Sequence, residues 1–395
     1  MSDGDDVTDG DHVNWAELIA ARLDSVRDEG RWRSIRTLDG GDISTVESST
    51  GRAVTGFASN DYLGLSQHPA VIAAAITEAK RSGAGAGAAR LIVGGRPVHD
   101  RLEVELASWT DRDAALLFPT GYQANVGVLG ALASAAGERG ALIGSDELNH
   151  ASIIDGARLA RAEVAVYPHN DLRRLDAVLD AADRPAIVVT DSVFSMDGDP
   201  ARLDDLAELC EHHGALLVVD EAHAVLGPRA PESAVIVGTL SKTLGAQGGF
   251  VASSRDVIDL CTNVARAFIF TTALAPTSAA AALASLEILR SAEGDDLLAR
   301  LRHNIDLIMP GHPSPIIPII LGGEDRAMSV AAALLEQGLL VPAIRPPTVA
   351  PGRCRLRIAL SAAHSESQLL RLRAALDDLA VSVGGPFTDE AGNLG

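Results

Sequence analysis

The chain has few aromatic residues, three cysteines and only two lysines. Phe, Trp and Tyr make up 3% of its 395 residues while 47% are hydrophobic, so we expect a core built mainly of Ala, Val, Leu and Ile. Cys210, Cys261 and Cys354 are widely spaced and form no CxxC pair, which indicates neither a disulfide framework nor a zinc or other metal site. A reducing cytoplasm fits this cysteine pattern.

Positive charge and long apolar runs are also scarce. The formal net charge of −20 argues against a general nucleic-acid binder, because neutralising phosphates requires a basic face. No uncharged stretch reaches the roughly 18 residues that a membrane span needs, and the N-terminus opens with acidic residues rather than with a basic segment before an apolar run. We therefore expect neither membrane insertion nor secretion.

Short β-branched runs alternate with Ala- and Leu-rich helical stretches. Examples are AIVVTD (186–191), a helical pattern over 201–213, ALLVVDE (215–221) and AVIVG (234–238). This alternation predicts an α/β fold with parallel strands joined by crossover helices. Ligands of such sheets gather at the carboxyl ends of the strands.

Composition divides the chain into four parts. We predict an N-terminal arm and helix over 1–58, a large domain over 59–285, a small C-terminal α+β domain over 286–385, and a flexible tail over 386–395. Residues 1–12 are expected to be frayed as well, because they are rich in Asp and Gly. The small domain is predicted to contain a helix near 327–338 and a strand near 355–360.

Lys242 lies in the segment GTLSKTLG (238–245), and the only other lysine is Lys80. In a chain that takes nearly all its positive charge from arginine, this lysine suggests a need for an amine that can lose its proton and form a Schiff base. A guanidinium group stays charged and cannot do so. The alternative is an ordinary surface lysine in an arginine-rich composition.

Asp220 ends one predicted strand, His223 follows three residues later, and Lys242 comes after the next strand. This order resembles the residue set of fold-type I pyridoxal-phosphate enzymes. The resemblance implies that Lys242 binds the cofactor, that Asp220 keeps the pyridine nitrogen protonated, and that His223 reaches the ring hydroxyl. Taken singly, an Asp at a strand end is usually a cap or turn residue, and a lone His is usually structural.

Further motifs narrow the resemblance to the α-oxoamine synthase family. They are SNDYLGLSQHP (59–69), FPTGYQANVGVLG (118–130), NHASIIDGARL (149–159), DSVFSMDGD (191–199), DEAHAVLG (220–227) and FIFTTALAP (268–276). The resemblance implies a mostly parallel central sheet flanked by helices, a smaller C-terminal domain, and pyridoxal 5'-phosphate as the cofactor. It also implies that His150 stacks on the cofactor ring and that Ser195 lines its pocket. Without the family, His150 would be interpreted as a turn residue.

The same resemblance assigns the residues around the cofactor phosphate. Gly121 and Tyr122 would supply backbone N–H groups at the start of a helix, where the helix dipole favours an anion. Thr239 would add a hydroxyl group. Thr271 or Thr272 would contribute from the other subunit of a homodimer.

The segment 344–364 is similar to the branch of the family that condenses L-alanine with a pimeloyl thioester in biotin biosynthesis. Here the resemblance implies that Arg345 binds the amino-acid carboxylate through two parallel hydrogen bonds of its guanidinium group, and that Thr348 lies beside the substrate. It also implies that Arg31 binds substrate. The alternatives are a simple surface loop at 345–351 and, around Arg31, a solvated basic face.

Two segments depart from expected patterns. GAGAGAARLIVGG (83–95) follows a helical run rather than a strand, so we reject a dinucleotide site there, and alanines at 86 and 89 replace serines of the family. After His223 the family usually has Gly-Thr-Gly, whereas this chain has Ala224 and a shorter loop, and alanine adopts a positive φ less readily than glycine. Three alternatives to this reaction therefore stay open: the use of another amino acid, the use of another acyl thioester, and a protein that is catalytically silent. The thioester carrier, coenzyme A or acyl carrier protein, is open as well.

Overall fold

The computed structural model describes residues 14–382, so the tails predicted at 1–12 and 386–395 lie outside the described residues. Its main element is a seven-stranded sheet in the order β4-β10-β9-β8-β7-β5-β6. Strands β5 to β9 pair in parallel, and β10 is antiparallel to both β4 and β9. The bounds are β4 (Ala114–Phe118), β5 (Leu142–Asp146), β6 (Glu163–Tyr167), β7 (Ala186–Asp191), β8 (Leu216–Asp220), β9 (Val235–Thr239) and β10 (Gly249–Ser253). The predicted α/β fold with a mostly parallel sheet is confirmed.

Helices cover both faces of this sheet, which is why its strands, except β6 at the edge, are buried along nearly their whole length rather than in alternate positions. In β7, for example, Val188 and Val189 belong to hydrophobic clusters on opposite faces. One face packs against α4 (Gly121–Ala135), α5 (Ala151–Leu159), α8 (Arg255–Val264) and α9 (Arg266–Ile269). The other packs against α3 (Pro97–Thr110), α6 (Leu172–Asp180) and α7 (Leu203–His213).

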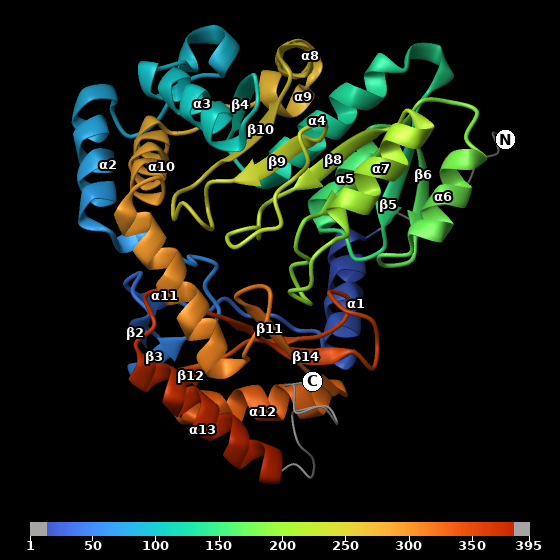
Figure 1. The fold of residues 1–395 in the computed structure, drawn as a ribbon. Coiled ribbons are helices and arrows are strands. Elements are labelled where there is room, and N and C mark those ends of the chain that lie inside the picture. Colours follow the sequence, from blue (N-terminus) through green and yellow to red (C-terminus); the bar gives the residue numbers. More distant parts are fainter. Residues whose placement is uncertain (1–13, 383–395) are drawn as a thin grey trace, which may run out of the picture.

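A second, smaller part lies below the large sheet in Figure 1. It holds two small sheets, one in the order β1-β2-β3-β12 and one in the order β11-β14-β13. Their strands are β1 (Leu38–Asp39), β2 (Ser44–Glu47), β3 (Arg52–Gly56), β11 (Ile316–Gly322), β12 (Leu339–Leu340), β13 (Ala343–Ile344) and β14 (Cys354–Ala359), and the helices are α12 (Glu324–Glu336) and α13 (Glu366–Ser382). Because β3 pairs in parallel with β12, strands from both ends of the chain build this part. The domain boundaries near 59 and 285 stay a proposal.

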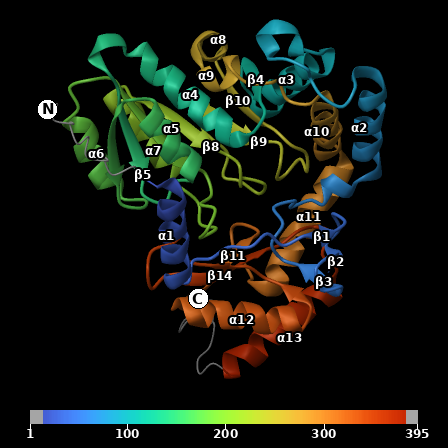
Figure 2. The ribbon, with the colours of Figure 1, turned by 180° about the vertical axis from the view of Figure 1, so that it is seen from behind.

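Three long helices connect the two parts or flank them. They are α1 (Trp15–Asp28), α10 (Pro276–Leu289) and α11 (Ala292–Ile308), and α2 (Pro69–Ser82) packs against α10. Short helical turns occur at Leu65–Gln67, Arg90–Gly94 and Gly137–Arg139. The loops that follow β7, β8 and β9 lie between the large sheet and the β11–β14 sheet in both views (Figures 1 and 2). Within residues 14–382, none of the helices combines the length and apolarity needed to cross a membrane.

Candidate active site

A cavity of about 210 Å³ lies at the carboxyl ends of β7, β8 and β9. Asp191, Asp220 and Thr239 are the last residues of these three strands, which is where ligands of parallel sheets gather. The cavity brings together many of the residues selected from the sequence, namely Gly121, Tyr122, His150, Asp220, His223, Thr239 and Lys242.

Lys242 lies on the loop after β9, and its Nζ is 2.9 Å from Nε2 of His223. Burial lowers the pKa of Lys242 to about 8, and the charge of Arg357 acts in the same direction, against the attraction of Asp220 and Asp191. Close to neutral pH this amine therefore loses its proton readily. That is the property that the sequence analysis required of the lysine.

His223 is held from its other side by the buried Tyr62, whose Oη lies 2.6 Å from Nδ1 of His223. Burial raises the pKa of Tyr62 to about 12, so its hydroxyl keeps its proton, and this hydroxyl also donates to Oδ1 of Asn60 at 3.2 Å. Burial, together with the charges of Lys242 and Arg357, holds the pKa of His223 well below its usual range. His223 is thus neutral, and its Nε2 faces the lysine amine.

Asp220 is fixed by two donors. Its Oδ2 accepts from Nδ2 of Asn125 at 2.7 Å, and its Oδ1 accepts from the backbone N–H of Ala222 at 2.9 Å. The two bonds hold the carboxylate in one orientation. Its neighbour across the sheet is Asp191, whose pKa is raised well above its ordinary value by burial and by the charge of Asp220.

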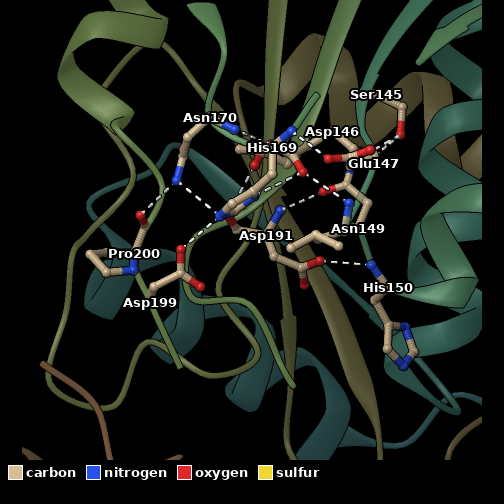
Figure 3. A network of polar contacts seen from close by, with 12 residues as sticks. Ser145, Asp146, Glu147, Asn149, His150, His169, Asn170, Asp191, Asp199 and Pro200 are labelled. Atoms are coloured by element: carbon tan, nitrogen blue, oxygen red, sulfur yellow. Dashed lines mark hydrogen bonds and ion pairs between the residues drawn. The ribbon is translucent and has the colours of Figure 1, made fainter. Parts of the chain in front are cut away.

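Figure 3 shows how His150 is positioned by a polar network at the ends of β5 and β7. The backbone N–H of His150 donates to Oδ2 of Asp191 at 2.7 Å, and the side chain of Asn149 joins Ser145, Val189 and Asp191. Burial and the charge of Lys242 lower the pKa of His150, while Asp220 acts in the opposite direction. The imidazole therefore enters the cavity as a neutral group.

The network continues to His169, whose ring bridges two carboxylates. Nδ1 lies 3.1 Å from Asp146 and Nε2 lies 2.7 Å from Asp199 (Figure 3). Burial opposes a charge on this ring, but the hydrogen bonds and charges of Asp146 and Asp199 prevail and raise the pKa of His169 to about 10. A charged imidazole thus joins the segment after β6 to the turn after β7.

The start of α4 lies beside Thr239. The helix cannot use the N–H groups of its first residues, Gly121 and Tyr122, so they are free to face an anion. A Cβ at Gly249 would come within 2.4 Å of the backbone nitrogen of Gly121, so only glycine permits this approach of β10. Oγ of Ser241 lies 2.7 Å from Oγ1 of Thr239, which adds a second hydroxyl.

Other predicted residues lie outside the lining of this cavity. The carbonyl of Ser195 accepts from Nε of Arg357 at 2.6 Å, which places Ser195 at the border between the two parts of the fold. Oγ1 of Thr271 accepts from Nε2 of Gln123 in the first turn of α4 at 3.2 Å, and Thr272 next to it is exposed. Both threonines therefore lie close to the helix start.

Arg345, Thr348 and Arg31 are not brought to Lys242. The guanidinium of Arg345 donates to the carbonyls of Gly30 and Trp32, and with Thr348 it lines a separate cavity of about 580 Å³. Arg31 pairs with Glu29 at 2.8 Å and is not part of that lining. Two further arginines of the same segment, at positions 33 and 36, do line it.

Arg357 and Asn60 belong to the site but were not selected from the sequence. Arg357 is 5% exposed, and its Nη2 donates to Oδ1 of Asn60 at 3.1 Å, while its charge acts on Lys242, His223 and Tyr62. The signal was available in RLRIAL, where two arginines two residues apart in a predicted strand must share one face. Both are buried in β14.

The loop after His223 does not have the strain that the sequence suggested. Ala224 is buried and is absent from the residues with positive φ in the described chain, whereas Gly227 adopts φ 92°. Glu221 anchors the loop by accepting from the backbone N–H of Ala230 at 2.6 Å. The substitution of alanine for glycine therefore leaves the neighbourhood of His223 intact.

Comparisons with known proteins agree with this geometry. A family model for aminotransferases of class I and II matches residues 52–376. The chain belongs to this family. Among curated members of the aminotransferase class I and II family, it is 47% identical over 392 residues to the 8-amino-7-oxononanoate synthase of Anaeromyxobacter dehalogenans, covering 92% of this chain and 96% of that protein. It is 48% identical over 357 residues to the enzyme of the same name from Burkholderia thailandensis, covering 83% and 89%. The predicted resemblance to α-oxoamine synthases is confirmed.

Solved structures give the same result for the fold. Serine palmitoyltransferase from S. paucimobilis, solved with a bound PLP–myriocin aldimine, matches with a TM-score of 0.84 at 28% identity, covering 93% of this chain and 98% of that one. The 8-amino-7-oxononanoate synthase of Francisella tularensis matches with a TM-score of 0.69 at 28% identity, covering 84% and 98%.

Pyridoxal phosphate fits the residues of the cavity. The site offers a buried amine that loses its proton near neutral pH, a carboxylate fixed by two hydrogen bonds, and a helix start with two hydroxyl groups beside it. These match the aldehyde, the ring nitrogen and the phosphate of that cofactor.

Proposed function

We propose that this protein condenses L-alanine with a pimeloyl thioester, with pyridoxal 5'-phosphate as cofactor, and releases 8-amino-7-oxononanoate, carbon dioxide and the free thiol in biotin biosynthesis. The observation that carries the proposal is the cavity in which Lys242 meets His223, Asp220 and the start of α4. The identity of 47% to an 8-amino-7-oxononanoate synthase supports this choice within the family.

When bound, the cofactor supplies an aldehyde that links to amines and a ring that accepts electrons from the α-carbon of the substrate. Lys242 would hold the aldehyde carbon, Asp220 would keep the ring nitrogen protonated, and His223 would face the ring hydroxyl. Gly121, Tyr122 and Thr239 would bind the phosphate, His150 would stack on the ring, and Ser195 would lie at its border.

Lys242 is also the group best placed to take the α-proton of alanine. Its lowered pKa makes the neutral amine available near pH 8, and Nε2 of His223, 2.9 Å away, orients the amine. Tyr62 fixes the His223 ring for this purpose, because its hydroxyl lies 2.6 Å from Nδ1. Two hydrogen-bonded side chains, Tyr62 and His223, thus support one base.

We assign the amino-acid carboxylate to Arg357 rather than to Arg345. Arg357 is a buried arginine, and its charge lowers the pKa of the nearby Lys242. The guanidinium of Arg345 already serves the carbonyls of Gly30 and Trp32. A carboxylate bound by Arg357 would lie in the same part of the site as the amine of Lys242.

The cavity of about 580 Å³ supports a pimeloyl chain as the second substrate. Its wall combines apolar residues such as Leu335 and Ile344 with arginines at 33, 36 and 345, and Thr348 lies at its edge. A chain of methylene groups that ends in a second carboxylate needs this combination. Arg31, on the same segment, stays a candidate for that carboxylate.

The proposal is tested with a panel of amino acids and acyl thioesters, with thiol release and product mass as readouts. L-alanine and pimeloyl thioester should give the highest kcat/KM, and both coenzyme A and acyl carrier protein thioesters should be supplied. Lys242→Ala should lose turnover and the visible absorbance of the bound cofactor. Lys80→Ala, the exchange of the only other lysine, should retain both.

Two outcomes would replace the proposal. Preference for another pair, such as serine with a long acyl chain, would indicate a different synthase, an alternative that the TM-score of 0.84 to serine palmitoyltransferase motivates. Cofactor binding without turnover of any pair would indicate a catalytically silent protein. We propose a cytoplasmic location, which the three free, buried cysteines support.

A further inference from the structure

A chain of hydrogen bonds links Asp220 to His150 through two residues that neither the sequence analysis nor the proposed reaction uses. Nδ2 of Asn125 donates to Oδ2 of Asp220 at 2.7 Å and to Oγ of Ser152 at 2.9 Å. Oγ of Ser152 lies 2.7 Å from Nδ1 of His150. Asn125 and Ser152 are each 1% exposed, so water does not compete for these bonds.

The direction of each hydrogen bond in this chain follows from the chemistry of its members. The charged carboxylate of Asp220 only accepts, so Asn125 must turn its NH₂ group toward it. This orientation leaves Oδ1 of Asn125 buried without a described partner, a cost that the two donated bonds offset. Since Ser152 accepts from Asn125, its hydroxyl proton is available for Nδ1 of His150.

A backbone contact independently indicates that Nδ1 of His150 carries no proton. His150 caps the N-terminus of α5, and its Nδ1 accepts from the backbone N–H of Ser152 at 3.2 Å. A backbone N–H can only donate, so a proton on Nδ1 would point directly at the proton of the Ser152 N–H. Two donors thus converge on Nδ1, and the ring proton must lie on Nε2, which has no described partner within residues 14–382.

We propose that Ser152 and Asn125 are positioning residues that hold His150 as the neutral tautomer with its proton on Nε2, and that tie this state to the negative charge of Asp220. The inference rests on the proposed function for its use: the Nε2–H then donates to an oxygen of the substrate bound in the cavity. The lowered pKa of His150 agrees with a neutral ring.

The test reads the tautomer directly and does not require turnover. Histidine is labelled with ¹⁵N, and long-range ¹H–¹⁵N correlation spectra are recorded against pH with and without pyridoxal phosphate, with His150→Gln used for assignment. We expect a proton on Nε2 alone in the native protein at pH 7. A proton on Nδ1, or a fully protonated ring at this pH, would overturn the inference.

Ser152→Ala removes one donor to the neutral ring, so the protonation midpoint of His150 should rise by roughly half to one pH unit. Ser152→Thr should restore the native midpoint. Asn125→Asp replaces the NH₂ donors by a second carboxylate, so it should raise the protonation midpoint of His150 further. This variant keeps the test decisive if Ser152→Ala folds poorly. In the active enzyme, the acid limb of kcat/KM should shift in parallel.

Ser285→Ala is the matched control, since Ser285 is a buried serine of α10 whose Oγ has no described partner. It should leave the midpoint unchanged. An unshifted midpoint in both Ser152→Ala and Asn125→Asp would overturn the inference. If the tautomer and the midpoint shifts are as expected but the protein has no turnover, the proposed function is contradicted. The positioning role of Ser152 and Asn125 is then still supported.

Discussion

At the scale of single residues, Arg357 acts on both Lys242 and His223. Burial is the main cause of the lowered pKa of both groups, and the positive charge of Arg357 lowers it further. Arg357 is itself held in place by the carbonyl of Ser195 and the amide oxygen of Asn60, which accept from it. One buried guanidinium thus adds to the effect of burial on both groups.

Exchange of Arg357 for Gln should therefore raise the pKa of Lys242 above about 8. In the cofactor-free protein, the pH midpoint for uptake of pyridoxal phosphate should move to higher pH, because only the neutral amine attacks the aldehyde. KM for the amino acid should rise roughly 10- to 100-fold through loss of a charge-assisted bond. Stopped-flow absorbance and steady-state kinetics measure the two effects.

Arg355→Gln is the control, since Arg355 is a second buried arginine of β14 whose partners are Asp197 and the carbonyls of Met196 and Arg353. It should cost stability but leave the uptake midpoint near the native value. Equal midpoints for all three proteins would refute the electrostatic role of Arg357.

Lys242, Asp220 and His223 could be predicted from the sequence because their order at two successive strand ends resembles the residue set of fold-type I pyridoxal-phosphate enzymes. In the arginine- and proline-rich segment that follows, Arg345 was selected and Arg357 was not. Which of them faces the site depends on the pairing of β14 with β11 and on the contact with the turn at Ser195. Such long-range contacts leave no local pattern.

At the scale of secondary-structure elements, His169 joins two connections that are distant in the sequence. It binds Asp146 at the end of β5 and Asp199 in the turn after β7, and its ring packs edge-on against Phe194 at a centroid distance of 4.4 Å. The same turn carries Ser195, and Asp191 at its start binds the backbone of His150. The His169 contact thus supports the loops that surround the cavity.

His169→Gln should reduce the free energy of unfolding at pH 6 by about 1–3 kcal/mol, because it leaves a buried carboxylate without its cation. In the folded protein, the pKa of His169 is raised from 6.5 to about 10. The native ring therefore contributes its full stability below pH 6.5 and loses it as pH rises toward 10. Urea unfolding at pH 6, 8 and 10 should show a difference between the two proteins that shrinks with pH.

His213→Gln serves for comparison, because His213 makes a single contact, at 2.8 Å, with the exposed Asp176. Its effect at pH 6 should be the smaller of the two. A His169→Gln effect that grows with pH would show that the ring is neutral in the folded state. This network could not be predicted from the sequence, because the connections after β5, β6 and β7 are unrelated in local pattern and meet only in the folded sheet.

At the scale of the whole molecule, we propose a homodimer, as the family resemblance implies. An apolar patch consisting of Leu91, Ile92, Val93 and Phe270 is exposed, with Val93 at 69% and Phe270 at 70%. A backbone bond of 3.0 Å from Ala273 to Ala88 holds its two segments together. Since Thr271 lies between this patch and the start of α4, a partner on the patch would also reach the phosphate site.

Val93→Asp should therefore shift the protein toward monomers and weaken the binding of pyridoxal phosphate, because a charge would be buried in the interface. Light scattering and a spectral titration measure these effects. Val166→Asp is the control, since Val166 is also 64% exposed but lies on β6 at the opposite edge of the large sheet. A dimer that persists in Val93→Asp would refute this patch as the interface.

The parallel pairing of β3 with β12 has a consequence for synthesis of the protein on the ribosome. Residues 52–56 emerge early, but their partner at 339–340 is translated only after the whole large sheet. The large sheet can therefore form first, while one edge of β3 stays unpaired until β12 has been translated. A chain truncated before residue 339 would keep the strands of the large sheet and lack this closure.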